Sequence, residues 1–135
     1  MTTVLLVEDD PDVAAASEAI LEHLGYLAMV ASDGRQGLAL MMSTQPDIVI
    51  TDVMMPVMSG LEMIERARNM RYEGLIVVCS ATLERDYRNH HARYDAFLQK
   101  PYRMEDLAMT LRRLQDRLPN RSNCADTDKP FSSSR

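Results

Sequence analysis

The chain has 135 residues, of which 46% are hydrophobic and 5% aromatic, with no tryptophan and a formal net charge of −5. This length suits one domain built around a single aliphatic core. The acidic balance argues against non-specific nucleic-acid binding, which needs a basic surface, and no apolar run approaches the roughly 20 residues of a membrane span.

The ends of the chain and its cysteines indicate the compartment. The first residues, MTTVLLVEDD, lack the basic start and long apolar stretch of a signal peptide. Cys79 lies in an apolar run and Cys124 in a polar segment, which is no disulfide framework. We therefore expect a cytoplasmic protein that contacts neither membrane nor nucleic acid directly.

The first apolar run, residues 3–7, predicts a buried strand. Asp10 suits the N-cap and Pro11 the first turn of the helix that follows, and Gly25 predicts the end of that helix. The apolar stripe of this helix is expected at Val13, Ala16, Ile20, Leu21 and Leu24.

The middle of the chain repeats the pattern. Residues 27–31 predict a second strand, and residues 32–43 predict a second helix, which Pro46 ends. Residues 47–52 predict a third strand, and a third helix is expected to begin near Gly60.

The last part of the chain adds two more strands and two more helices. Residues 75–80 predict a fourth strand that is apolar on both faces. The polar segment 82–95 is expected to be helical, residues 96–99 to form a short fifth strand, and residues 104–118 to form a last amphipathic helix.

The domain is expected to end near residue 118. Residues 119–135 contain one large apolar residue, Phe131, and cannot bury enough surface to offset the entropy of ordering. We expect residues 1–118 to form the domain and residues 119–135 a disordered tail. The tail is either native or a remnant of a longer protein.

Five strands alternating with five helices predict a doubly wound α/β fold. Continuous apolar strands are typical of parallel sheets covered by helices on both faces. In such sheets, ligands bind beyond the carboxyl ends of the strands.

Polar side chains stand at the carboxyl ends of four expected strands: Glu8, Asp9, Asp52, Ser80 and Lys100. Like charges ~4 Å apart cost about 4 kcal/mol at an effective dielectric near 20, so the acids need a cation or a proton. Oxygen-only ligands favour a hard divalent ion, Mg²⁺ before Zn²⁺. Lys100 and Ser80 suit phosphate oxygens, and Asp52, on the central strand, suits a nucleophile that would form an aspartyl-phosphate.

Four segments, VLLVEDDP, PDIVITDVMMPVMSG, CSAT and FLQKP, occur in the order and near the spacing found in one family. From residue 3 to about 118, the chain resembles the receiver domain of two-component response regulators. The resemblance implies a stand-alone receiver with a flavodoxin-like (βα)5 fold and the strand order 2-1-3-4-5.

The resemblance implies a role for each acid. Asp52 would be the phosphoacceptor, charged from a phosphohistidine on a sensor histidine kinase or a histidine phosphotransfer protein. Glu8, Asp9, Asp52 and the backbone carbonyl of Met54 would hold Mg²⁺, for which Mn²⁺ could substitute. The protein would be no enzyme in the usual sense, but would catalyse phosphotransfer to its own aspartate and slow autodephosphorylation.

The resemblance also implies a switch. Lys100 would pair with the phosphoryl group, and its bond to Pro101 is often cis in this family. Ser80 would move toward the phosphoryl group and Phe97 would rotate inward. This would alter the face formed by the fourth helix, the fifth strand and the fifth helix, where a downstream protein target binds. Met54 and Thr82 occupy the positions that tune phosphate lifetime, and neither can orient an attacking water.

The segment before Lys100 departs from the family. It lacks the glycine that usually ends the fourth helix, and it carries Arg85, Arg88 and Arg93 in an otherwise acidic chain. We expect an irregular helix here and a role in partner specificity.

Two other functions compete with the receiver reading. A phosphohydrolase of the haloacid-dehalogenase type would need a second acid two residues after its nucleophile, where this chain has Met54. A phosphate-independent adaptor would have no need of the acids, the serine and the lysine together. The sequence leaves open whether the domain dimerises.

Overall fold

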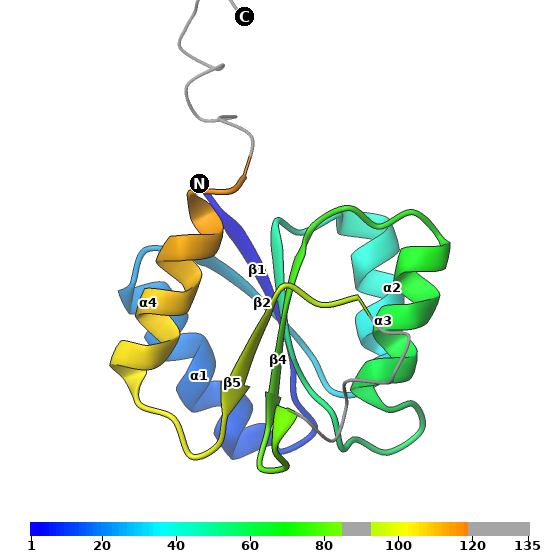
Figure 1. Cartoon of the computed structure of the whole chain (residues 1–135), viewed down its shortest axis with the longest axis horizontal. Helices are drawn as coiled ribbons and strands as arrows, with labels where there is room; N and C mark the ends of the chain where they lie inside the picture. The colour runs from blue at the N-terminus through cyan, green and yellow to red at the C-terminus, as the bar shows by residue number, and fades with distance from the viewer. Residues whose placement is uncertain (85–92, 119–135) are drawn as a thin grey trace, which may run out of the picture.

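The computed structural model describes residues 1–84 and 93–118. Within these ranges, the structure has five strands and four helices (Figure 1). The strands are β1 (Thr3–Val7), β2 (Leu27–Ala31), β3 (Ile48–Asp52), β4 (Leu75–Ser80) and β5 (Ala96–Gln99). The helices are α1 (Pro11–His23), α2 (Gly34–Thr44), α3 (Gly60–Asn69) and α4 (Met104–Gln115).

All the strands are parallel, and they lie in the order β2-β1-β3-β4-β5, which confirms the predicted flavodoxin-like topology. The helix α4 is the fifth helix of the sequence prediction. The helix expected between β4 and β5 falls largely on residues 85–92, which lie outside the described ranges, as do residues 119–135. None of the helices in the described part combines the length and apolar character that a membrane crossing requires.

The helices form two layers, with α1 and α4 on one face of the sheet and α2 and α3 on the other (Figure 1). Side chains alternate along each strand, so Val4 and Leu6 enter the core under α1 and α4, whereas Leu5 and Val7 enter the core under α2 and α3. Both faces of the central strands are therefore buried under helices, which explains their continuous apolar sequence.

The first helix begins as expected but faces the core differently. The Asp10 carboxylate accepts hydrogen bonds from the backbone of Asp12 (2.9 Å) and Val13 (3.3 Å), and Pro11 is the first helical residue. The expected stripe was wrong at its amino-terminal end, because Val13 is 44% exposed and Ala16 is also exposed, whereas Ala14 is buried instead. Ala14 and Leu21 lie seven residues apart, two full turns, and this line faces the sheet.

The last helix ends three residues before its expected boundary, at Gln115. The part of its predicted apolar stripe that lies within the helix is confirmed, since Leu107, Leu111 and Leu114 are all buried. Leu118 lies beyond the helix and packs at the edge of the same core.

Candidate functional site

The polar residues named from the sequence meet at the carboxyl edge of the sheet. Glu8 and Asp9 follow β1, Asp52 ends β3, Ser80 ends β4 and Lys100 follows β5. Because β1, β3, β4 and β5 are consecutive and parallel in the sheet, their carboxyl ends share one edge. The fold therefore brings together residues that are up to 92 positions apart in the chain.

Three carboxylates form a compact cluster. Glu8, Asp9 and Asp52 each offer one oxygen, and these oxygens lie within 4.8 Å of one another. Glu8 is buried and the Asp52 side chain is 11% exposed, whereas Asp9 is exposed. An all-oxygen donor set of this size fits a hard divalent cation such as Mg²⁺.

The titration of Glu8 reflects this crowding. Burial, and after it the hydrogen bond and the charge of the neighbouring Asp52, raise the pKa of Glu8 to about 7. The backbone N–H of Asp10, which donates to Glu8 Oε2 at 3.1 Å, opposes this shift. The cluster therefore favours either a proton on Glu8 or a bound cation, as the sequence predicted for three converging acids.

Lys100 supplies the positive charge of the site. Its Nζ forms an ion pair with Asp52 Oδ1, and its side chain is 34% exposed. Burial alone would lower the pKa of Lys100, but the hydrogen bond and charge of Asp52 outweigh it and raise that pKa. The Lys100–Pro101 peptide bond is cis. The ammonium group is thus held charged beside the carboxylate.

Ser80 lies at the base of the site and is only 5% exposed. Its Oγ accepts a hydrogen bond from the backbone N–H of Thr82 at 3.0 Å, and its carbonyl accepts one from the backbone N–H of Lys100 at 2.8 Å. These bonds tie the loop after β4 to the residue that carries the ammonium group. Thr82 itself is exposed.

The loop after Asp52 is shaped by close backbone packing. Thr51 Oγ1 donates to the carbonyl of Asp52 at 2.9 Å, and the N–H of Gly60 donates to the carbonyl of Val53 at 2.9 Å. A Cβ at position 60 would overlap the carbonyl oxygen of Asp52, so only glycine allows α3 to begin this close to the strand. Met54 projects outward and is 79% exposed.

Phe97 lies apart from the acids, on β5. Its ring packs against Tyr94, with ring centroids 6.3 Å apart, and against the core under α2 and α3. It is partly buried.

Sequence reasoning missed Asp95, an acid outside this site that three groups contact. Asp95 pairs with both Arg68 and Arg117, and it accepts a hydrogen bond from Ile76. The sequence shows no signal for this network, since its members are spread over α3, β4 and the two ends of the β5–α4 unit.

Comparison with known proteins agrees with the observed fold. Residues 4–112 match the family model of the response regulator receiver domain. The chain belongs to this family, whose members act in two-component signalling.

Among relatives, the response regulator MprA of Mycolicibacterium vanbaalenii is 34% identical over 113 residues, which cover 82% of this chain and 49% of MprA. The chain thus spans about half the length of the curated relatives it matches. The receiver domain of the Francisella response regulator 1452 superposes with a TM-score of 0.80 at 25% identity, covering 87% of this chain and 98% of that one.

A second similar structure holds ligands. The response regulator TrrA of Thermotoga maritima, crystallised in complex with Mg²⁺ and BeF, matches with a TM-score of 0.76 at 27% identity, covering 84% of this chain and 99% of TrrA. The carboxylate cluster of Glu8, Asp9 and Asp52 could hold a metal ion.

Proposed function

We propose that the chain is a phosphoacceptor switch in which Asp52 takes a phosphoryl group from a phosphohistidine on a sensor histidine kinase or a histidine phosphotransfer protein. One observation carries the proposal: the Asp52 carboxylate lies among two further carboxylates and is paired with the Lys100 ammonium group. A nucleophile, an oxygen-rich cation site and a fixed positive charge are the parts that phosphoryl transfer to an aspartate needs.

The transfer forms an oxygen–phosphorus bond on Asp52 and breaks a phosphorus–nitrogen bond on the donor. An oxygen of the Asp52 carboxylate attacks phosphorus, the phosphorus–nitrogen bond of the phosphohistidine breaks, and the imidazole leaves with the electron pair and takes a proton. Mg²⁺, or Mn²⁺ in its place, would neutralise the phosphoryl oxygens when held by Glu8, Asp9, Asp52 and the carbonyl of Met54. Lys100 would release its ion pair with Asp52 and pair with the phosphoryl group.

The output would follow from two further residues. The buried Ser80 hydroxyl would move toward the phosphoryl group and donate a hydrogen bond to one of its oxygens. Phe97 would then rotate inward, toward the space that Ser80 leaves. The ring of Phe97 packs beside Tyr94, which lies two residues before β5, so its rotation would alter the surface formed by the segment before β5, β5 and α4. A downstream protein would read this surface.

The test is phosphorylation by a small-molecule donor. The protein is incubated with Mg²⁺ and acetyl phosphate, and its intact mass is measured. We expect one phosphoryl adduct that is absent without Mg²⁺ and absent in Asp52→Asn. Continuous hydrolysis of phosphate esters would indicate a phosphohydrolase instead, and no adduct together with no Mg²⁺ binding would indicate an adaptor.

A further inference from the structure

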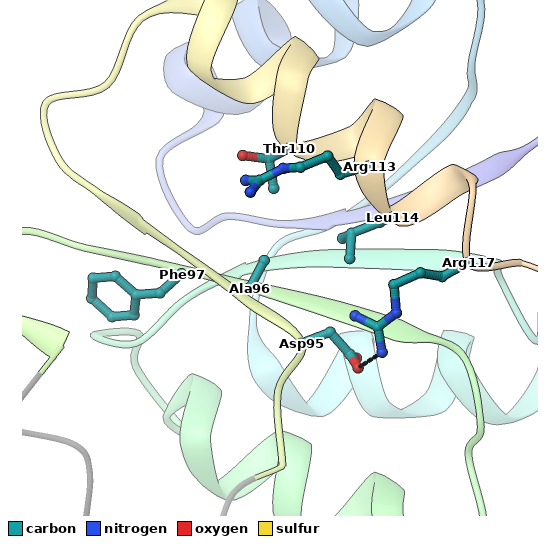
Figure 2. Close-up of a pocket in the computed structure, with 7 residues that line it drawn as sticks. All are labelled: Asp95, Ala96, Phe97, Thr110, Arg113, Leu114 and Arg117. Atoms are coloured by element: carbon teal, nitrogen blue, oxygen red, sulfur yellow. Dashed lines mark hydrogen bonds and ion pairs between the residues drawn. The ribbon is translucent and has the colours of Figure 1, made fainter.

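A groove of about 370 Å³ lies between β5 and α4, away from the acid cluster. Its apolar lining includes Ala96 and Leu114, and the Arg113 side chain on α4 and the Arg117 side chain just after that helix complete it (Figure 2). Ala96 projects toward α4, whereas the neighbouring Phe97 ring points away from it (Figure 2). The groove therefore combines an apolar surface with guanidinium groups at its rim.

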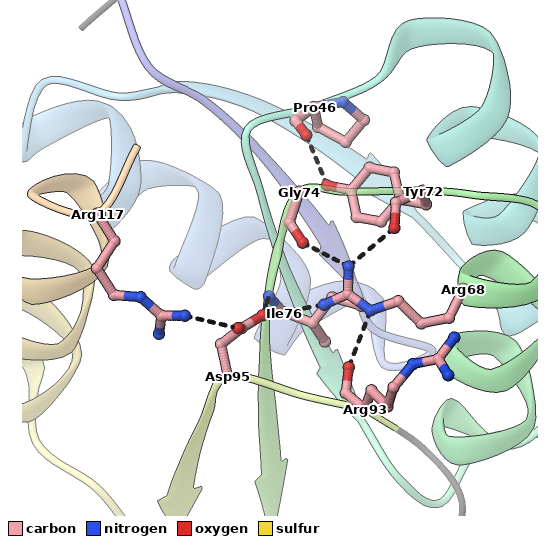
Figure 3. Close-up of polar contacts among 8 residues, drawn as sticks. All are labelled: Pro46, Arg68, Tyr72, Gly74, Ile76, Arg93, Asp95 and Arg117. Atoms are coloured by element: carbon pink, nitrogen blue, oxygen red, sulfur yellow. Dashed lines mark hydrogen bonds and ion pairs between the residues drawn. The ribbon is translucent and has the colours of Figure 1, made fainter. Parts of the chain in front are cut away.

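The acid at one end of the groove is held firmly in place. Asp95 Oδ1 pairs with Arg117 at 3.1 Å, while Oδ2 pairs with Arg68 at 3.0 Å and accepts the backbone N–H of Ile76 at 2.8 Å (Figure 3). The Asp95 side chain is 17% exposed and that of Arg68 is 12% exposed. Two guanidinium groups thus share one carboxylate, and both oxygens of this carboxylate already have partners.

Two further arginines near this network have no such partner. Arg113 and Arg93 are exposed, and within residues 1–84 and 93–118 neither side chain makes an ion pair. Arg68 and Arg117 therefore share the Asp95 carboxylate, and Arg113 adds a third guanidinium group at the groove. This is a local excess of positive charge in a chain whose net charge is −5.

We propose that this groove docks an acidic peptide segment of a partner protein, with a carboxylate on Arg113 and an apolar side chain on the apolar lining between Ala96 and Leu114. The planar guanidinium group favours bidentate contact with a carboxylate, and the fixed Asp95–Arg117 pair keeps the groove open without rearrangement. The inference rests on the proposed function in one respect, since it assigns a chemistry to the partner-binding face.

Basic residues near a helix carboxyl end also stabilise that end through the helix dipole. Arg112 and Arg113 share this position in the last turn of α4, so the dipole accounts for both equally. Only Arg113 lines the groove. Arg112 is therefore a matched control, because it has the same charge and the same place on the helix but lies outside the docking surface.

The experiment uses the full chain and a fluorescein-labelled peptide of alternating aspartate and leucine, with a matched peptide of alternating lysine and leucine. Binding is followed by fluorescence anisotropy, and the site is mapped by amide chemical-shift changes. We expect the acidic peptide to bind and the basic one not to bind, with shifts at Ala96, Thr110 and Leu114. Arg113→Glu and Arg113→Gln should weaken binding about tenfold or more, and Arg112→Glu less than about twofold.

Other outcomes would overturn the inference. Equal losses in the Arg112 and Arg113 variants would indicate a diffuse basic surface, and shifts outside the groove would place the peptide elsewhere. An Arg113-dependent dimer in sedimentation, without peptide binding, would make a second copy of the chain the occupant. The unaltered protein is also treated with acetyl phosphate: an adduct without peptide binding refutes the groove alone, whereas Arg113-dependent peptide binding without an adduct refutes the proposed function alone.

Discussion

Lys100, which follows β5, forms an ion pair with Asp52 at the end of β3, and so reaches across the end of β4, which lies between them. The pair joins the predicted nucleophile to the one lysine in the described part of the chain. It also supplies a positive charge next to the oxygens that a cation would use.

Removing this charge should strengthen cation binding and weaken phosphorylation. In Lys100→Met, we expect Mg²⁺ to bind about tenfold more tightly, since a like charge near the metal is lost. Modification of Asp52 by acetyl phosphate should become at least about tenfold slower, because the phosphoryl oxygens lose their partner. Calorimetric Mg²⁺ titration and intact mass measure the two effects. Lys100→Arg keeps the charge and should not tighten Mg²⁺ binding; an unchanged Mg²⁺ affinity in Lys100→Met would contradict the argument.

Magnesium binding should release a proton from Glu8. The pKa of Glu8 is raised to about 7 in the metal-free protein, so near neutral pH part of the population carries a proton that the metal must displace. Calorimetry near pH 7 in buffers of different ionisation enthalpy should detect this proton, and Mg²⁺ affinity should fall as the pH drops below about 7. Glu8→Gln should bind Mg²⁺ more weakly without proton release. Identical binding heats in all buffers would show that Glu8 is already ionised.

The same raised pKa predicts how stability depends on pH without metal. A carboxyl whose pKa rises on folding contributes stability that is fully present below its ordinary value of 4.5 and is lost as the pH rises through about 7. We expect the metal-free protein to lose stability across this window, and Glu8→Gln to lose less of it. Urea unfolding of both proteins across the window measures the difference. A constant gap between the two proteins would exclude Glu8 as the cause.

Gly60→Ala should be strongly destabilising. The added Cβ would overlap the backbone carbonyl of Asp52, and backbone cannot move aside as a flexible side chain does. We expect a loss of roughly 2–4 kcal/mol in the free energy of unfolding. Gly25→Ala is the comparison, because its φ is +97° but no atom lies within 4 Å of the new Cβ, so its cost should be about 1 kcal/mol of backbone strain. Equal losses would mean that close packing at position 60 is relieved by a shift of α3.

Arg68→Ala should cost far more stability than Arg66→Ala. Arg68 donates to the carbonyls of Tyr72, Gly74 and Arg93 and pairs with Asp95, and its side chain is 12% exposed. Its removal takes one ion-pair partner from the partly buried Asp95 carboxylate and leaves several carbonyls without their donor, for a loss of about 3 kcal/mol.

Arg66 is the matched control, two positions away on the same helix. It makes an i, i+4 ion pair with Glu62 in which the two side chains are 57% and 45% exposed. Such exposed pairs contribute about 0.5 kcal/mol or less, and salt screens them. Chemical denaturation of the two variants gives the comparison, and a loss in Arg68→Ala as small as that in Arg66→Ala would show that the network adds no stability.

Met54→Asn should shorten the lifetime of the aspartyl-phosphate, if Asp52 is phosphorylated as proposed. The Met54 side chain is 79% exposed beside Asp52 and offers no group that could orient an attacking water. An amide there could do so, and we expect loss of phosphate at least about threefold faster, roughly 0.7 kcal/mol in the barrier. The mass of the adduct is followed over time after acetyl phosphate is removed. Met54→Leu should match the unaltered protein, and an unchanged rate in Met54→Asn would contradict the role of position 54.

The sequence determined the parts of this protein that depend on local pattern. Continuous apolar runs predicted each described strand within one residue of its observed bounds, and Asp10 and Pro11 marked the start of α1. The acid cluster was also predictable, because parallel strands place their carboxyl ends at one edge, so Glu8, Asp9 and Asp52 must meet once the alternation of strands and helices is read.

Only the tertiary structure decided which side chains share space across elements that are far apart in the chain. The face of α1 that enters the core was misjudged because Val13 and Ala14 differ by one rotation of 100°, and the sheet packing selects between them. Asp95, Arg68 and Arg117 show no sequence pattern, since their pairing depends on where α3 and α4 end relative to β5. Such contacts arise from the packing of two helical layers on one sheet, and no short stretch of sequence contains that geometry.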